Sequence, residues 1–201
     1  MIYYLFKYIV LPFYWLIRMP KIYGKENLKL IKKGKAIIIS NHRSMLDPLF
    51  IALISNRFIH FMAKSELFDN KLSAWLFRNL LVFPINRGKS DMNSIKRALE
   101  VLQQDKVFGI FPEGKRSVTN DIDLFEKGAA FLAVKSEAPI LPMYIPVDNY
   151  RLFKRPRIYI GELITADKYQ TNKAKSVIVR EITTCTENVI NELKIISEED
   201  K

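Results

Sequence analysis

The stretch Ala36-Ile-Ile-Ile-Ser-Asn-His-Arg-Ser-Met-Leu-Asp-Pro48 decides the fold and the candidate chemistry of this chain. Its first five residues form a β-branched run typical of a buried strand, and Asp47-Pro48 has the form of a helix N-cap followed by the proline favoured at the first helical position. On a continuous helix, residues five apart are separated by about 140° around the axis and do not touch. A contact between His42 and Asp47 therefore requires a loop between strand and helix, which this sequence predicts.

We interpret His42 as a general base and Asp47 as the carboxylate that orients it. Taken singly, the two residues have plainer interpretations, a loop histidine and a helix cap. The pairing gains weight because the chain has only two histidines, and the other, His60, lies within the apolar run Phe58-Ile-His-Phe-Met62. This run is typical of a strand interior, so we assign His60 a structural role. His42 would instead lie at the carboxyl end of a strand, where open α/β sheets place their ligand sites.

The chain is 201 residues long, which fits one domain with a hydrophobic core of its own. Its single cysteine, Cys185, is expected on the core-facing side of the last helix. It excludes an internal disulfide and permits a reducing compartment. Two histidines and one cysteine provide no zinc-ligand cluster, so we expect no metal and predict no cofactor.

The net charge of +11 is unevenly distributed along the chain. The first 36 residues contain eight lysines and arginines and a single acid, Glu26. This excess predicts an anionic partner, for which the candidates are nucleic acid, an anionic membrane face and a phosphate-bearing small molecule.

Residues Met1–Met19 form a nearly continuous apolar stretch with seven aromatic side chains, interrupted by Lys7, Pro12 and Arg18. Aromatic rings at this density favour the membrane–water boundary. A spanning helix requires about 20 apolar residues, so a span and two short interfacial helices bent at Pro12 both remain open, with the interfacial arrangement favoured. The basic start and the small-residue cleavage site of a signal peptide are missing. Among the anionic partners, a membrane is therefore favoured over nucleic acid.

Strand-like and helix-like runs alternate through the rest of the sequence. Strands are expected at Ala36–Ser40, Phe58–Ala63, Val82–Ile85, Val107–Phe111, Ile140–Ile145 and Arg157–Ile160. The clearest helices are Asp91–Gln104, with an apolar stripe of Met92, Ile95, Leu99 and Leu102, and Lys173–Ile196, with a stripe of Ile178, Ile182, Cys185, Val189, Leu193 and Ile196. Ser197–Lys201 is expected to be a frayed tail. The alternation predicts an α/β domain over residues 22–201, with a mostly parallel or mixed sheet flanked by helices, after a membrane-associating helical segment at residues 1–21.

Polar clusters follow three further strands, and they are expected at the same sheet edge as His42. They are Lys64-Ser-Glu66, Asn86-Arg87-Gly88 and Pro112-Glu113-Gly114-Lys115-Arg116-Ser117. Each alone is typical of a charged loop, but their recurrence indicates one shared site. Arg87 and Arg116 have forked donors suited to a phosphate, and Lys64 supplies a point charge. Glycines 88 and 114 permit close approach of a ligand to the backbone.

Two alternative chemistries are suggested by short motifs. The run Gly109-Ile-Phe-Pro-Glu-Gly-Lys-Arg116 nearly spells the phosphate-binding P-loop, but Arg116 replaces the Ser or Thr that binds magnesium and Pro112 removes an amide donor. A kinase or NTPase is thus a minor alternative. Ser44 or Ser117 beside His42 suggests a nucleophile, but the chain lacks a Gly-x-Ser-x-Gly elbow. We therefore favour direct base catalysis without a covalent acyl-enzyme.

With these segments in place, the chain resembles the glycerophospholipid acyltransferase family, whose hallmark is His-x-x-x-x-Asp, and most closely its bacterial 1-acyl-glycerol-3-phosphate acyltransferases. The resemblance covers about residues 22 to 146 and five motifs in the family order: Asn41-His-Arg-Ser-Met-Leu-Asp-Pro48, Ala63-Lys-Ser-Glu-Leu-Phe68, Pro84-Ile-Asn-Arg87, Phe111-Pro-Glu-Gly114 and Ala138-Pro-Ile-Leu-Pro142. The chain departs from the common pattern at Asn86, where the family commonly has Asp, and at Lys115, where it commonly has Thr. Neither departure affects His42 or Asp47.

The resemblance implies a membrane-associated acyltransferase that moves an acyl chain from acyl-CoA or acyl-carrier protein to the sn-2 hydroxyl of lysophosphatidate, giving phosphatidic acid. His42 would take the hydroxyl proton, a task suited to imidazole with its unperturbed pKa of about 6.5, and Asp47 would fix its tautomer. It also implies that Lys64, Arg87, Glu113 and Arg116 hold the acceptor's glycerol phosphate, while amides around Gly114 are candidate oxyanion donors.

This interpretation places the protein at the cytoplasmic face of the cell membrane, as a monotopic or peripheral enzyme. Its partners would be lysophosphatidate, the acyl donor and an anionic membrane surface, with no nucleic acid. Two alternatives stay open: an acyltransferase for another lysolipid, and a non-enzymatic basic module that binds membranes or nucleic acid.

Overall fold

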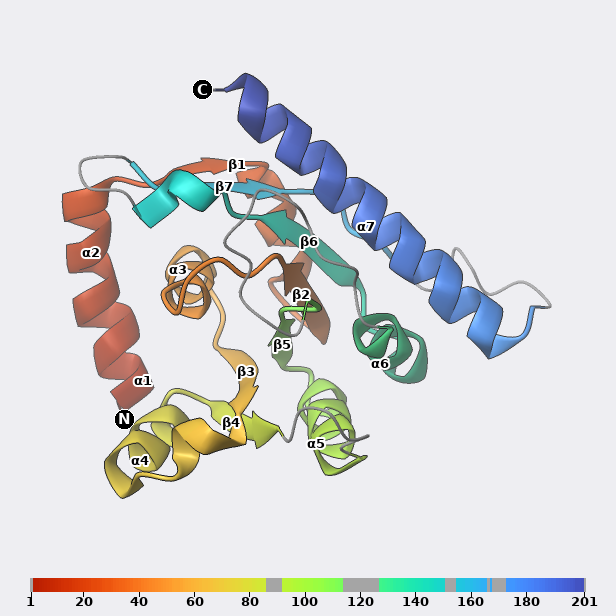
Figure 1. Cartoon of the computed structure of the whole chain (residues 1–201), viewed down its shortest axis with the longest axis horizontal. Coiled ribbons are helices and arrows are strands. Elements are labelled where there is room, and N and C mark those ends of the chain that lie inside the picture. The colour runs from red at the N-terminus through yellow and green to blue at the C-terminus, as the bar shows by residue number, and fades with distance from the viewer. Residues whose placement is uncertain are drawn as a thin grey trace.

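A seven-stranded sheet forms the centre of the computed structural model, which describes residues 2–85, 92–113, 127–150, 155–165, 167 and 173–200 (Figure 1). The strands are β1 (Lys21–Tyr23), β2 (Ala36–Ser40), β3 (Ile59–Lys64), β4 (Val82–Ile85), β5 (Val107–Ile110), β6 (Ile140–Tyr144) and β7 (Arg157–Ile160). Their order across the sheet is β1-β7-β6-β2-β5-β3-β4, and every neighbouring pair is parallel except β6 and β7. The predicted α/β domain with a mixed, largely parallel sheet is confirmed.

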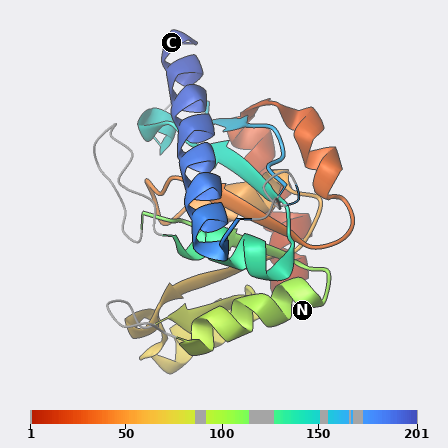
Figure 2. The ribbon, with the colours of Figure 1, turned by 90° about the vertical axis from the view of Figure 1, so that its right-hand side faces the viewer.

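Helices cover both faces of the sheet. They are α1 (Ile2–Leu5), α2 (Leu11–Arg18), α3 (Asp47–Ile54), α4 (Lys71–Asn79), α5 (Met92–Gln103), α6 (Gly128–Ser136) and α7 (Lys175–Glu199), with 3-10 helices at Lys25–Ile31, Ser65–Phe68 and Val147–Tyr150. The apolar sides of α5, α6 and α7 form one core cluster with the sheet, and Figure 2 shows these three helices in front of it. On the opposite face, α3 and the first 3-10 helix form a second cluster.

The central strand β2 is buried at all five of its residues. It pairs with β6 on one side and β5 on the other, so its backbone donors and acceptors are used in two ladders. Both of its faces also meet helices, which is why its sequence is a continuous apolar run rather than an alternating one. This position places the residues that follow Ser40 in the middle of the carboxyl edge of the sheet.

Strand β1 was not predicted from the sequence. It has only three residues, and its partner β7 lies more than 130 positions further along the chain, with Lys21 opposite Arg157 and Tyr23 opposite Tyr159. The stacked rings of Tyr23 and Tyr159, 4.5 Å apart, hold the two strands together. Such a short strand exists because of its partner and carries little local signal.

Two details of the predicted helices are wrong. Met92, expected on the buried stripe of α5, is 67% exposed, and the helix buries Ala98 and Val101 instead. In α7, Ile196 was expected to be buried, but it is exposed and the neighbouring Ser197 is buried instead. The helix also continues beyond its predicted end, to Glu199.

The expected frayed tail is also wrong, because the end of α7 is attached to β7. Arg157 donates hydrogen bonds to the carbonyl oxygens of Ser197 (3.4 Å) and Asp200 (3.2 Å) and forms an ion pair with Asp148. The hydroxyl of Tyr159 donates to the Asp200 carboxylate at 3.1 Å. A cation at the C-terminal carbonyls of a helix is electrostatically favourable.

The N-terminal segment is helical from Ile2 to Arg18, and Figure 1 shows α1 and α2 as one continuous ribbon. They are joined by a π-helical turn, Phe6–Val10, which ends two residues before Pro12. Proline has no amide donor and clashes with the carbonyl four residues earlier, so a local widening of the helix accommodates it. The two helices expected around Pro12 are therefore joined without a break. No helix among the described residues is both long and apolar enough to span a membrane.

Candidate active site

His42 and Asp47 meet at the carboxyl edge of the sheet, as the sequence predicted. His42 follows β2, and its Nδ1 lies 2.9 Å from Oδ2 of Asp47. Residues 41–44 have no regular secondary structure and residues 45–46 form a turn, so a loop separates β2 from α3. The imidazole is 15% exposed, whereas the carboxylate is fully buried.

Three hydrogen bonds converge on one oxygen of Asp47. Besides the His42 ring, Oδ2 accepts the backbone N–H groups of Arg43 (2.6 Å) and Ser44 (2.7 Å). Asp47 is itself the first residue of α3, where the helix dipole favours a negative charge. The predicted N-cap role is therefore wrong, because the capping position is Leu46 and the Asp47 carboxylate turns back over the preceding loop.

This arrangement determines which ring nitrogen of His42 is available for chemistry. A carboxylate that accepts two amide N–H groups is an acceptor for the imidazole as well, so Nδ1 carries the hydrogen and donates it to Asp47. Nε2 is then left with its lone pair. The geometry is that of a general base oriented by a buried carboxylate.

Asn41 contributes a structural contact that the sequence analysis missed. Its side-chain amide donates to the carbonyl of Ile145 at 2.9 Å, and its Oδ1 accepts the Ile145 N–H at 2.7 Å. These two bonds continue the β2–β6 pairing by one residue beyond the last register pair, Ser40 with Met143. Asn41 is fully buried, so it fixes the backbone from which His42 projects. No sequence signal identifies it, because its partner is over 100 residues away.

Two of the predicted substrate-binding residues are placed at the same edge. Lys64 ends β3, and Glu113 follows β5 with only 6% of its surface exposed. Since β2, β5, β3 and β4 are parallel neighbours, their carboxyl ends share one edge with His42. Lys64 forms an ion pair with Glu66 at 2.7 Å, but both side chains are about half exposed, so this pair is weak and exchangeable. The predictions for Arg87, Gly114 and Arg116 fall outside the described residues.

The two alternative chemistries receive no support from the described geometry. Gly109, the first glycine of the P-loop-like run, lies inside β5 and pairs with Phe61 of β3 rather than lining a loop. The Ser44 hydroxyl accepts the N–H of Leu46 at 3.2 Å, which is the arrangement of a turn. Ser117 lies outside the described residues. In the parts of the chain that the structure describes, no three His, Cys, Asp or Glu side chains are grouped to hold a metal ion.

His60, the second histidine, lies in β3 as predicted and is partly buried. Burial lowers its pKa below the usual range because the charged form is poorly solvated there, and Lys106 and Arg97 act in the same direction. This environment fits the structural role assigned to it.

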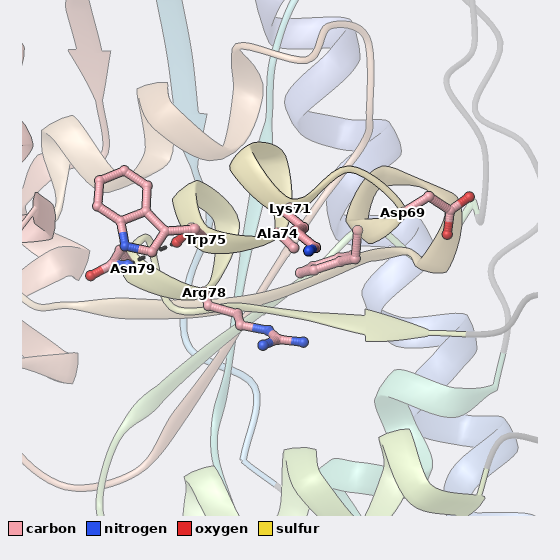
Figure 3. A pocket seen from close by; sticks show the side chains of 7 residues that line it. Asp69, Lys71, Ala74, Trp75, Arg78 and Asn79 are labelled. Carbon is pink, nitrogen blue, oxygen red and sulfur yellow. Dashed lines mark hydrogen bonds between the residues drawn. The ribbon is translucent and has the colours of Figure 1, made fainter.

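A separate hollow of about 350 Å³ lies beside α4 and does not involve His42 or Asp47 (Figure 3). Its lining residues are Phe68, Asp69, Lys71, Ala74, Trp75, Arg78 and Asn79. The His42–Asp47 pair, the dyad, thus lies at the sheet edge and not within this hollow.

Comparison with known proteins identifies relatives of the chain. The family model described as Acyltransferase matches residues 20–146. The 1-acyl-sn-glycerol-3-phosphate acyltransferase of Bacillus subtilis is 33% identical over 147 residues, which cover 71% of this chain and 72% of that protein. The enzyme of the same name from Streptococcus pneumoniae is 34% identical over 127 residues, 61% of this chain and 46% of the relative, so this chain spans less than half of that protein.

A solved structure supports the fold. The crystal structure of the 1-acyl-sn-glycerophosphate acyltransferase from Thermotoga maritima superposes with a TM-score of 0.69, covering 90% of this chain and 73% of the other. The sequence identity is 22%, so this similarity concerns the fold.

Proposed function

Since the chain belongs to the acyltransferase family, we propose that it transfers an acyl chain from a thioester donor, acyl-CoA or acyl-carrier protein, to the sn-2 hydroxyl of 1-acyl-glycerol-3-phosphate, giving phosphatidic acid. The observation that carries this proposal is the 2.9 Å contact between His42 Nδ1 and the fully buried Asp47 carboxylate at the edge of the sheet. The names of the relatives support the choice of acceptor.

In the proposed reaction, Nε2 of His42 takes the proton of the acceptor hydroxyl. The oxygen then forms a bond to the thioester carbonyl carbon, and the resulting tetrahedral intermediate breaks its carbon–sulfur bond to release the thiolate. The imidazolium returns the proton to that sulfur, so the products are phosphatidic acid and a thiol. His42 is thereby regenerated as the neutral base.

Asp47 acts through His42. It keeps the Nδ1–H tautomer, so that the lone pair of Nε2 faces the substrate, and it stabilises the imidazolium while the proton is on the ring. The amide groups of Arg43 and Ser44 prevent the carboxylate from rotating away. We assign the oxyanion of the intermediate to backbone amides around Gly114.

The acceptor phosphate needs cations close to the dyad. Lys64 lies at the same sheet edge in an exchangeable surface ion pair, so it can turn to a phosphate without a large cost. We propose that Lys64, Arg87 and Arg116 hold the phosphate and that Glu113 helps to hold the glycerol part. Another lysolipid with a phosphate headgroup would fit the same groups and is the alternative acceptor.

The N-terminal helix is proposed to bind the membrane. One side is attached to the domain: the hydroxyl of Tyr3 accepts the Ile59 N–H at 3.1 Å, and Lys7 donates to the carbonyl of Arg57 at 2.6 Å. Large apolar side chains on the helix are exposed to solvent, namely Tyr4, Leu5, Tyr8, Ile9, Val10, Phe13, Leu16 and Ile17. An exposed apolar face within a segment rich in lysine and arginine, the basic cluster of the first 36 residues, fits an anionic bilayer surface.

We therefore propose a monotopic or peripheral enzyme on the cytoplasmic face of the cell membrane, with residues 1–21 as the membrane-associating segment and residues 22–201 as the acyltransferase domain. Acceptor and product carry acyl chains and would enter and leave through the bilayer. The basic cluster would attract anionic headgroups by about 1 kcal/mol for each nearby lysine or arginine.

The test uses purified full-length protein, vesicles that contain lysophosphatidate, and acyl-CoA or acyl-carrier protein. Thiol release and phosphatidic acid are measured together, for the wild type and for His42→Ala. One thiol for each phosphatidic acid in the wild type, with both lost in His42→Ala, supports the proposal. Faster turnover with another lysolipid selects the alternative acceptor. Vesicle binding without thiol release from any donor and acceptor selects the non-enzymatic module.

A further inference from the structure

A row of aromatic rings crosses the carboxyl edge of the sheet and ends on His42. Phe61 of β3 stacks on Phe111, which follows β5, with ring centroids 5.9 Å apart and planes 11° apart. Phe111 in turn stacks on the His42 imidazole, with centroids 4.2 Å apart and planes 23° apart. Phe61 lies in β3, while Phe111 and His42 follow β5 and β2, and these three strands are neighbours in the order β3, β5, β2.

Gly109 provides the space for this row. It is the register partner of Phe61 across β3 and β5, and the Phe61 ring occupies the space that a Cβ atom of residue 109 would take. A Cβ atom at position 109 would overlap with that ring and would push it out of line. Phe111 is two residues further along the chain, so its side chain lies on the same side of the sheet as the Phe61 ring. The two rings can therefore stack.

Phe111 restrains a motion of His42 that Asp47 leaves free. The hydrogen bond from Nδ1 to Asp47 fixes the direction of one ring nitrogen, but the ring can still tilt about that bond. A flat ring stacked 4.2 Å away blocks the tilt. The face of a benzene ring also carries partial negative charge, so it attracts a cation more strongly than a neutral ring. Phe111 thus presents a favourable surface to the imidazolium that forms when the base takes a proton.

We propose that Phe111 is a positioning residue for His42, holding the plane of the imidazole and stabilising the imidazolium that forms during acyl transfer, and that Phe61 and Gly109 hold Phe111 in place. This inference rests on the proposed role of His42 as the base. It also gives Gly109 a structural role, which this glycine lacked once the P-loop interpretation was set aside.

A second pair of stacked phenylalanines supplies a matched control. Phe83 and Phe108 stack with centroids 5.8 Å apart and planes 15° apart, and both belong to the core cluster under α5 and α6, on the other face of the sheet. Phe108 lies in β5, three residues from Phe111, and is fully buried. Its replacement by leucine removes a stacked ring on the face of the sheet opposite the Phe61–Phe111 pair.

The experiment measures kcat and KM for lysophosphatidate in the wild type, His42→Ala, Phe111→Leu, Phe111→Tyr and Phe108→Leu. Loss of the stack in Phe111→Leu is expected to lower kcat about tenfold with KM changed less than about twofold, the size of effect that cation–π contacts support. Phe111→Tyr keeps a ring and is expected to retain most of kcat. Phe108→Leu is expected to keep the wild-type kcat.

The outcomes separate this inference from the proposed function. If His42→Ala turns over at the wild-type rate, the base assignment fails, and this inference fails with it. If His42→Ala is inactive but Phe111→Leu keeps the wild-type kcat, only the present inference is overturned. It is also overturned if Phe108→Leu loses as much kcat as Phe111→Leu, since the effect would then be general packing.

A measurement on the wild type covers the case in which Phe111→Leu does not fold. A ring stacked face to face shifts the proton resonances of its neighbour upfield, and with only two histidines in the chain His42 is assigned by comparison with His42→Ala. We expect the His42 ring protons upfield of the ordinary histidine positions. Ordinary positions for these protons would overturn the inference.

Discussion

The His42 loop and the N-terminal helix both bury a charged side chain, but the fold satisfies the two charges differently. Asp47 is fully buried and accepts hydrogen bonds from the His42 ring and from two backbone amides. Lys7 is 9% exposed and has one hydrogen bond, to the Arg57 carbonyl, together with a cation–π contact to Phe58 at 5.0 Å. Burial lowers the pKa of Lys7 to about 8, because the charged ammonium group loses its hydration there.

The difference indicates what each region is built for. Around Asp47 the donors fix one geometry, as a site that positions a reacting group requires. The N-terminal helix is held at a few points, and the large apolar side chains on its outward side are exposed to solvent. Changes at the loop should therefore act on the rate, while changes on the helix should act on membrane binding and stability.

The largest expected effect is that of Asp47→Asn. The amide oxygen would take the place of Oδ2 and still accept the N–H groups of Arg43 and Ser44 and the hydrogen of the His42 ring. The side chain would lose the negative charge that stabilises the imidazolium. By analogy with the carboxylate of serine-protease triads, kcat should fall about 10⁴-fold while the fold is retained. Thiol release and circular dichroism measure the two properties. Turnover within tenfold of the wild type would remove Asp47 from the mechanism.

Asn41→Ala should come next, because it releases the backbone from which His42 projects. Loss of both bonds to Ile145 should cost about 1–3 kcal/mol of unfolding free energy. A displacement of the base of about 1 Å should lower kcat up to about 10²-fold. Asn27→Ala is the matched control, since Asn27 also donates to backbone carbonyls, those of Ile160 and Gly161, away from His42. Equal kcat losses in the two variants would contradict a specific role for Asn41.

The helix side of the comparison is tested by replacing Tyr8, Phe13 and Ile17 with serine. If these exposed side chains enter the bilayer, the triple variant should bind anionic vesicles at least about tenfold more weakly, since each buried apolar side chain contributes about 1.5–3 kcal/mol. Turnover of a short-chain, water-soluble lysophosphatidate should stay unchanged. Ile195→Ser, at an exposed site on α7, is the control. Unaltered vesicle binding of the triple variant would show that the membrane contact lies elsewhere.

The smallest expected effect concerns the charge of Lys7 and the pH. The unfolded chain holds the Lys7 proton up to about pH 10.5, whereas the folded protein loses it from about pH 8. Between these values the unfolded state binds more protons, so this group makes the folded state more stable as the pH rises. Relative to Lys7→Met, the wild type should gain unfolding free energy between pH 7.5 and about pH 10 in urea titrations. If the difference in unfolding free energy between the two proteins does not change with pH, the pKa of Lys7 is not lowered by burial.

The sequence allowed the prediction of features whose signals are local. The bounds of β2, β4 and β7 match their apolar runs, and the dyad follows from a histidine and an aspartate on either side of a predicted loop. Features that depend on distant partners were missed or wrong. Strand β1 exists because β7 lies beside it, and the bonds of Asn41 require Ile145 at the end of β6. The end of α7 is ordered because Arg157 binds its carbonyls.

The most direct test of the central claim is the tautomer of His42, read from the ¹⁵N resonances of its ring at a pH where the imidazole is neutral. With two histidines in the chain, comparison with His42→Ala assigns the signals. We predict a protonated Nδ1 and an unprotonated Nε2 in the wild type, with this preference lost in Asp47→Ala, which removes the acceptor oxygen. A wild-type His42 protonated at Nε2, or one that gives the same spectrum in Asp47→Ala, would contradict a base held by Asp47.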